Sequence, residues 1–121
     1  NLIIMQEVIG HMPLAMGYRV LRRSFDLLES GGHLVVTTPN VSHPTHFHHA
    51  DFTHVQHYPL RDLYGLLRTI GFAPDIECRV IEIRNPNMLP KERIIRLTRR
   101  VLFKLLGFAN AEGILLKARK P

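Results

Sequence analysis

The sequence predicts an α/β fold in which helices cover both faces of a mainly parallel sheet, giving three layers. One observation is the stretch 27–40, LLESGGHLVVTTPN, which has the pattern of a helix end, a tight glycine turn and a strand. Its apolar run at 34–36 is not interrupted by polar residues, as is typical of a strand buried on both faces of a parallel sheet. The other observation is that strand-like and helix-like segments alternate along the chain.

The first elements follow from local patterns. Residues 2–5 (LIIM) are an apolar run that predicts a buried strand, and residues 6–12 form the loop that leaves its carboxyl end. From 14 to 28 apolar residues recur at spacings of three and four, the period of a helix with one buried face. Pro13 before this helix and Gly31 after it are the residue types that favour helix starts and ends.

The alternation continues through the second half of the chain. The strand predicted at 33–38 ends at Pro39, because proline cannot donate to a neighbouring strand. The later elements are a polar loop at 39–59, a helix at 60–70, a strand at 76–83, a helix at 91–106 and a strand at 113–119. The predicted order is therefore β-α-β-α-β-α-β.

Length and composition limit the number of domains and the classes of protein to which the chain can belong. The chain has 121 residues, of which 45% are hydrophobic, enough for the core of one domain or of part of one. A single cysteine, Cys78, excludes an internal disulfide and fits a cytoplasmic location. No apolar run approaches the roughly 18 residues that a spanning helix needs. Because the chain starts at Asn1 inside an apolar strand-like run, we expect further sequence before it.

The net charge of +6 is concentrated in one segment. Between positions 91 and 104 there are six basic residues and one acid, Glu92, a local balance of +5. A domain-wide basic surface is therefore not expected, and Phe103 is the one aromatic residue in the segment, so no base-stacking platform is evident. We expect no nucleic-acid partner. The basic residues are Lys91, Arg93, Arg96, Arg99, Arg100 and Lys104.

The same segment has an apolar stripe at helical spacing. Most helices of this kind lie on a sheet or cap a pocket. Lysine and arginine opposite leucine and isoleucine is also the pattern of a helix that contacts an anionic membrane surface, so peripheral membrane contact through 91–106 stays open. The stripe consists of Ile94, Ile95, Leu97, Val101, Leu102, Leu105 and Leu106.

Three strings, MQEVIGHM, LLESGGHLVVTTPN and DFTHVQHYPLRDLYGLLRTIGF, resemble in order and spacing the carboxyl-terminal half of a class I S-adenosylmethionine-dependent methyltransferase of the small-molecule type. In that family the fourth strand ends in a sequence like E-V-I-E-H, and a P-G-G turn leads to the fifth strand. The resemblance implies a partial Rossmann-like three-layer sandwich with strands four to seven of the sheet, the last antiparallel. Residues 1–121 would be the carboxyl-terminal part of a methyltransferase domain, with 86–111 an inserted basic helical segment.

The resemblance also implies a cofactor and a catalytic group. S-adenosylmethionine would lie with its methionine portion and sulfonium beside Met5, Gln6 and Glu7. His11 follows this loop and is the candidate general base for a substrate hydroxyl, because an imidazole titrates near neutral pH. The alternative is that His11 caps the following helix and bonds backbone groups.

The histidine-rich loop is the expected substrate side. The family's D-x-T-H element is matched by Asp51, Thr53 and His54, and we expect substrate contacts from Asn40, Asp51 and His54. For Asp51 the alternative is an ordinary turn in which its carboxylate bonds Thr53 or a backbone amide. Metal binding by the loop stays open, since imidazole and carboxylate suit zinc, iron or nickel, but the spacing matches no recognised ligand frame and we assign no metal. The side chains concerned are His43, His46, His48, His49, Asp51, His54 and His57.

The chain departs from the family pattern in several places. The glycine-rich loop after the family's first strand and the acidic residue after its second strand are absent, and Gly10 stands where a glutamate is usual. The resemblance as a whole implies methyl transfer to a small-molecule acceptor. Because the two cofactor-binding elements are missing, we expect little or no cofactor binding by these residues alone. The alternative is a non-catalytic interaction module whose exposed first strand pairs with a partner or with a second copy in a homodimer.

Overall fold

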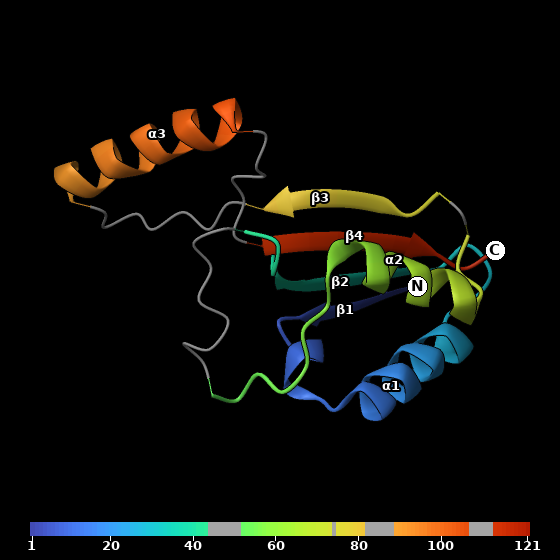
Figure 1. Cartoon of the computed structure of the whole chain (residues 1–121). Helices are drawn as coiled ribbons and strands as arrows, with labels where there is room; N and C mark the ends of the chain where they lie inside the picture. The colour runs from blue at the N-terminus through green and yellow to red at the C-terminus, as the bar shows by residue number, and fades with distance from the viewer. Residues whose placement is uncertain (44–51, 74, 82–88, 107–112) are drawn as a thin grey trace.

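The computed structural model describes residues 1–43, 52–73, 75–81, 89–106 and 113–121 (Figure 1). The described elements follow the predicted order, with one short 3₁₀ helix added in the first loop. They are β1 (Leu2–Gln6), η1 (Ile9–His11), α1 (Leu14–Leu27), β2 (His33–Pro39), α2 (Leu60–Ile70), β3 (Glu77–Ile81), α3 (Pro90–Leu105) and β4 (Gly113–Arg119).

The strands form one four-stranded sheet in the order β1-β2-β4-β3. β1 and β2 are parallel neighbours, with Leu2 opposite His33 and Gln6 opposite Thr37. β4 lies between β2 and β3 and is antiparallel to both. The predicted antiparallel last strand is therefore confirmed, as is the Rossmann-like α/β class.

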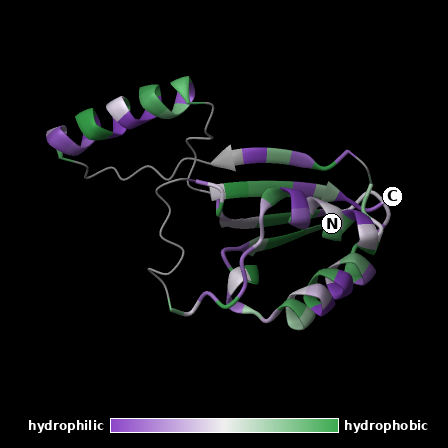
Figure 2. Ribbon diagram, viewed as in Figure 1, coloured by the Kyte–Doolittle hydropathy of each residue, from purple (hydrophilic) through white to green (hydrophobic). Residues whose placement is uncertain are grey.

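Helices α1 and α2 cover one face of this sheet and form the core with it. Alternate strand residues point to opposite faces. Leu34 and Val36 of β2 and Leu116 of β4 point toward the helices and are fully buried, against Leu21 of α1 and Leu67 of α2. Figure 2 shows the apolar colouring of the inner strands.

The opposite face of the sheet differs from the prediction. The run 34–36 was predicted to be buried on both faces, but β2 alternates between buried and half-buried residues, and Val35 is half-buried. Ile4, which pairs with Val35, is 62% exposed, and Leu2 on the same strand is 57% exposed. Within the described residues no helix lies on this face, so two of the three predicted layers are present there.

Helix α3 stands apart from the sheet, beyond the end at which β3 finishes (Figure 1). It covers most of the predicted basic segment 86–111; positions 86–88 and 107–111 lie outside the described residues. The helix begins at Pro90, one position earlier than predicted. Proline is tolerated in the first turn because the N–H that it lacks would have no partner within the helix there. Among the helices that the structure describes, none has the length and apolar character needed to cross a membrane.

Candidate functional site

The candidate site lies where β1 and β2 end. Because the two strands are parallel and in register, their carboxyl ends meet at one edge of the sheet. This is the edge at which open α/β sheets bind ligands. The loop after β1 leads through η1 to His11, and the turn after β2 begins at Asn40.

Glu7, the first residue after β1, has an unusual backbone. Its φ of 53° lies in the left-handed region, which non-glycine residues rarely adopt and which is often found at functional sites. Its amide donates to both the carbonyl oxygen (3.2 Å) and the hydroxyl Oγ1 (3.1 Å) of Thr37, so the loop is pinned to β2. The Glu7 side chain is left exposed at the edge of the sheet.

The two residues before Glu7 point in opposite directions. Met5 is 8% exposed and packs in the core with the helices, so only its backbone is available to a ligand at the edge. Gln6 is exposed on the other side of the strand. Of the three predicted cofactor contacts, Gln6 and Glu7 therefore present accessible side chains.

His11 is held by the segment that precedes α2. Its Nδ1 lies 2.9 Å from the hydroxyl Oγ1 of Thr53 and 3.2 Å from the Thr53 carbonyl oxygen. A carbonyl can only accept, so the tautomer with hydrogen on Nδ1 satisfies both contacts. In that tautomer the lone pair lies on Nε2, the form that can accept a proton.

His54 stacks on His11. The two ring centroids are 4.3 Å apart and the rings are inclined by 25°. The pair is fixed further by the amides of Val55 and Gln56, which both donate to the carbonyl of Gly10. The structure thus brings together two predicted residues, His11 and His54, from segments about forty positions apart in the sequence.

Gly10 is what allows this close packing. A Cβ atom on Gly10 would lie 2.7 Å from Cδ2 of His54, closer than real side chains approach. The family usually has glutamate at this position, and in this chain His54 occupies the space that a side chain there would need. Sequence reasoning did not foresee this link, nor the Thr53 contact to His11, although Thr53 belongs to the D-x-T-H match.

Asn40 lies in a tight turn and is 5% exposed. Its side-chain Oδ1 accepts from the amide of Ser42 at 3.1 Å, and its carbonyl accepts from the amide of His43 at 3.0 Å. These bonds give Asn40 a role in shaping the turn after β2. Its predicted contact with a substrate stays a prediction.

The predicted substrate contacts and the histidine-rich loop both include residues outside the part of the chain that the structure describes. Asp51 lies there, together with His46, His48 and His49 of the histidine-rich loop. In the part of the chain that the structure describes, no group of three histidine, cysteine or acidic side chains is placed as a metal would require.

The parallel β1–β2 pair and the antiparallel β4 beside it are the arrangement of a Rossmann-like sheet. The sequence model of the family described as "Methyltransferase domain" matches residues 1–76, more than half of the chain. The chain therefore belongs to the methyltransferase domain family. No curated protein sequence matches it.

Solved structures with the same fold include several methyltransferases. An S-adenosylmethionine-dependent methyltransferase from Archaeoglobus fulgidus is 16% identical, with a TM-score of 0.73 over 99% of this chain and 59% of its own. Phosphoethanolamine N-methyltransferase 2 from Haemonchus contortus, solved with S-adenosyl-L-methionine, is 16% identical, with a TM-score of 0.63 over 99% of this chain and 33% of its own. The chain thus spans little more than half of the archaeal protein and a third of the nematode one.

The fold also occurs in a protein named for another reaction. The [4+2]-cyclase SpnF is 17% identical, with a TM-score of 0.60 over all of this chain and 50% of its own. At such identities the likeness shows the fold alone, and the reaction has to be argued from the site.

Proposed function

We propose that this chain supplies part of an active site, with both cofactor and acceptor contacts, that transfers a methyl group from S-adenosylmethionine to a small-molecule oxygen, nitrogen or carbon. The observation that carries the proposal is His11, held by Thr53 and His54 in the loop that follows β1 of a methyltransferase-domain sheet. The exposed Glu7 lies in the same loop, four positions earlier.

The chemistry of the edge fits the cofactor. S-adenosylmethionine supplies an electrophilic methyl group on a positively charged sulfonium. Glu7 offers an exposed carboxylate, and among the described residues no cation pairs with it. The Glu7 carboxylate is therefore available to meet a cation. Gln6 beside it can hydrogen-bond the polar end of the methionine portion.

His11 is suited to take a proton from the acceptor. The Thr53 carbonyl holds hydrogen on Nδ1, which leaves Nε2 as the basic nitrogen. The stacked His54 ring restricts how the His11 ring can turn, so the base is positioned before the acceptor arrives. Thr53 and His54 are therefore positioning residues in this proposal.

Cofactor binding is the first test. Titration of the intact, folded protein with S-adenosylmethionine by calorimetry should show binding. Replacing Glu7 by Gln should weaken it about tenfold, because a charged partner is lost. Glu29→Gln is the matched control, since Glu29 is also exposed but lies at the opposite end of the sheet, before β2. Absence of binding by the folded intact protein would defeat the proposal.

The role of His11 as general base is tested by measuring turnover. S-adenosylhomocysteine release is measured with a panel of small hydroxyl and amine acceptors. His11→Gln should lower kcat by about 10²–10⁴-fold with cofactor affinity unchanged, because a positioned base contributes on that order. Thr53→Val should cause a smaller loss, and His33→Gln, half-buried at the far end of β2, should have no effect.

A pH profile separates catalysis from structure. The wild-type rate should fall on acidification, because a protonated imidazole cannot accept a proton, and His11→Gln should lack that fall. A His11→Gln protein that melts earlier but keeps its kcat would assign His11 a structural role only.

One observation favours a second candidate, an interaction module that pairs through β1. In the described sheet β1 is an edge strand, and its Leu2 and Ile4 are more than half exposed. An open apolar edge is a template for pairing with a partner or with a second copy. Size-exclusion chromatography with light scattering decides this: a stable monomer counts against the module, and a dimer dissociated by Ile4→Lys supports it.

A further inference from the structure

Helix α3 faces the rest of the protein with its less apolar side. In an ordinary amphipathic helix the apolar stripe is buried and the charged side faces water. In α3, four residues of the predicted stripe, called the apolar stripe from here on, are exposed: Ile94 is 67%, Leu97 61%, Val101 54% and Leu105 78% exposed. These residues recur at spacings of three and four and so share one side of the helix.

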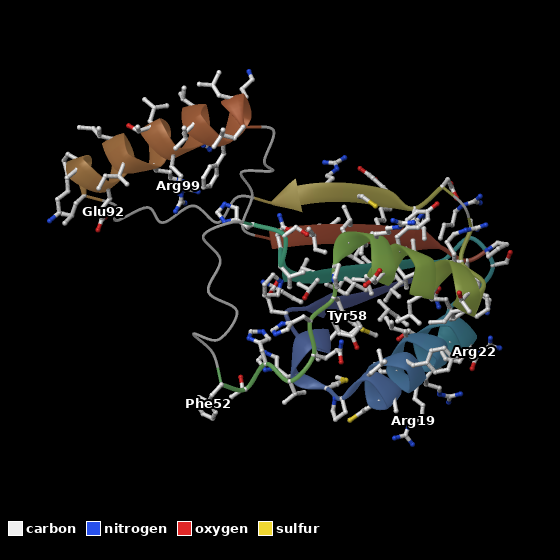
Figure 3. The ribbon with its side chains drawn as sticks, viewed as in Figure 1. Arg19, Arg22, Phe52, Tyr58, Glu92 and Arg99 are labelled. Atoms are coloured by element: carbon white, nitrogen blue, oxygen red, sulfur yellow. The ribbon has the colours of Figure 1, made fainter. Side chains whose placement is uncertain are left out.

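The opposite side of α3 makes the contact with the body. Phe103 is 7% exposed, and its ring meets that of His43 edge to face, with centroids 5.5 Å apart. Arg99, on the same side, is half-buried. In Figure 3, Arg99 and Glu92 lie on the side of α3 directed toward the rest of the chain. The apolar stripe is thus turned away from the part of the protein that the structure describes.

Exposed cations border the stripe. Arg93 and Arg100 lie four and three positions from Leu97, and Lys104 lies three from Val101, so all three flank the apolar side. The segment's one acid, Glu92, is used at the start of the helix, where its carboxylate accepts from the amide of Leu89 at 2.9 Å. The exposed side of α3 is therefore apolar and cationic. Figure 2 shows these two kinds of residue alternating along it.

We infer that α3 docks on an anionic lipid surface, with its apolar stripe in the acyl boundary and its row of cations on the headgroup phosphates. An apolar face bordered by lysine and arginine is the arrangement of interfacial helices. A second copy of α3 is a poorer partner, because two such helices would bring like charges together. The docking surface is defined by Ile94, Leu97, Val101, Leu105, Arg93, Arg100 and Lys104.

The position of α3 relates the docking surface to the candidate site. The helix lies beyond the carboxyl end of β3, and its anchor His43 bonds the Asn40 turn at the end of β2 (Figure 1). Helix α3 itself therefore lies at the end of the sheet that carries the candidate site, with its apolar stripe turned outward. This inference concerns a surface distinct from the His11 site and does not depend on methyl transfer.

Vesicle co-sedimentation of the intact protein tests the inference. Binding is expected to vesicles of phosphatidylcholine mixed with phosphatidylglycerol and not to phosphatidylcholine alone. The double variant Leu97→Gln/Val101→Gln should reduce binding more than tenfold by removing apolar contact. Each of Arg93→Gln and Lys104→Gln should reduce it about fivefold, since a cation near an anionic surface contributes on that order.

The controls use exposed apolar residues elsewhere. Leu14→Gln/Leu27→Gln changes two leucines of α1 that are 55% and 56% exposed, and should leave vesicle binding unchanged. Circular dichroism confirms that each variant is folded. The inference is overturned if the protein ignores anionic vesicles, or if the α3 and α1 variants behave alike.

A tryptophan reporter identifies the competing occupant. The 121 residues contain no tryptophan, so Leu105→Trp places one probe on the docking surface. Its emission should shift to the blue only when anionic vesicles are added. Emission already blue-shifted without vesicles would mean that another part of the protein covers the stripe, and would overturn the inference.

Discussion

At the scale of single residues, the buried hydroxyl of Tyr58 lowers the stability of the fold. The ring packs in the core and is 3% exposed, next to Gly17 of α1, where any Cβ would collide with the Tyr58 hydroxyl. That hydroxyl finds no hydrogen-bond partner among the described residues. Burial raises the pKa of Tyr58, because the charged phenolate is disfavoured away from water.

Removing this hydroxyl should stabilise the protein. Tyr58→Phe is expected to raise the free energy of unfolding by about 1 kcal/mol at neutral pH, since an unsatisfied buried polar group is removed. Urea denaturation measures the change. Tyr18→Phe is the control, because Tyr18 is 41% exposed. A loss of stability in Tyr58→Phe would mean that the hydroxyl has a partner.

The same residue predicts a pH dependence. Because the folded protein has the higher pKa, it keeps the Tyr58 proton where the unfolded chain begins to lose its own, near pH 10. The preference of the folded protein for protonated Tyr58 therefore does not lower its stability below that pH. As the pH rises further, the unfolded chain gains stability by ionising, and the free energy of unfolding of wild type falls. Unfolding curves of wild type and Tyr58→Phe should therefore diverge further above about pH 10. Parallel decline of the two proteins would contradict the assignment.

At the scale of elements, the carboxyl end of helix α1 is capped by a residue from the far end of the chain. α1 has no basic residue in its last turn. Lys120 follows β4, and its Nζ donates to the carbonyls of Phe25 (2.9 Å) and Leu28 (2.8 Å) and lies 4.7 Å from the Phe25 ring centre. A cation at a helix carboxyl end satisfies carbonyls that have no partner within the helix.

Removal of this cation should weaken the junction between α1 and the sheet. Lys120→Met is expected to lower the free energy of unfolding by about 1–2 kcal/mol, because two charged hydrogen bonds are lost. Thermal unfolding checks it. Lys117→Met, exposed on β4, should change stability by no more than about 0.5 kcal/mol. Equal effects of the two substitutions would show that the Lys120 contacts contribute nothing.

At the scale of the whole molecule, the described sheet is covered on one face only. β4 carries two consecutive leucines that point to opposite faces: Leu116 is fully buried under the helices, and Leu115 on the other face is half-buried. This pair measures how much each face is covered.

Truncation of each leucine should give unequal costs. Leu116→Ala should cost about 2–5 kcal/mol, the range for a fully buried leucine, and Leu115→Ala clearly less. Chemical denaturation of the intact protein measures both values. If Leu115→Ala costs as much as Leu116→Ala, a further layer covers the second face in the intact protein, which is the three-layer arrangement that the sequence predicts.

The sequence by itself determined the elements and the class of fold. The helical spacing of apolar residues predicted α1 and α2, and apolar runs predicted β1, β2 and β4, with bounds that agree within a residue or two. These signals are local, because a helix or strand must place its apolar side chains on one face over consecutive turns or pleats. The parallel pairing of β1 with β2 followed from the same α/β alternation and is confirmed.

The tertiary structure alone decided which distant residues meet. The contact of His11 with Thr53 joins residues 42 positions apart, and that of Lys120 with Phe25 joins residues 95 apart. The same holds for the direction in which α3 turns its apolar stripe, which the helical period leaves open. Local patterns report which side of an element is apolar, whereas the neighbour on that side depends on how the whole chain packs.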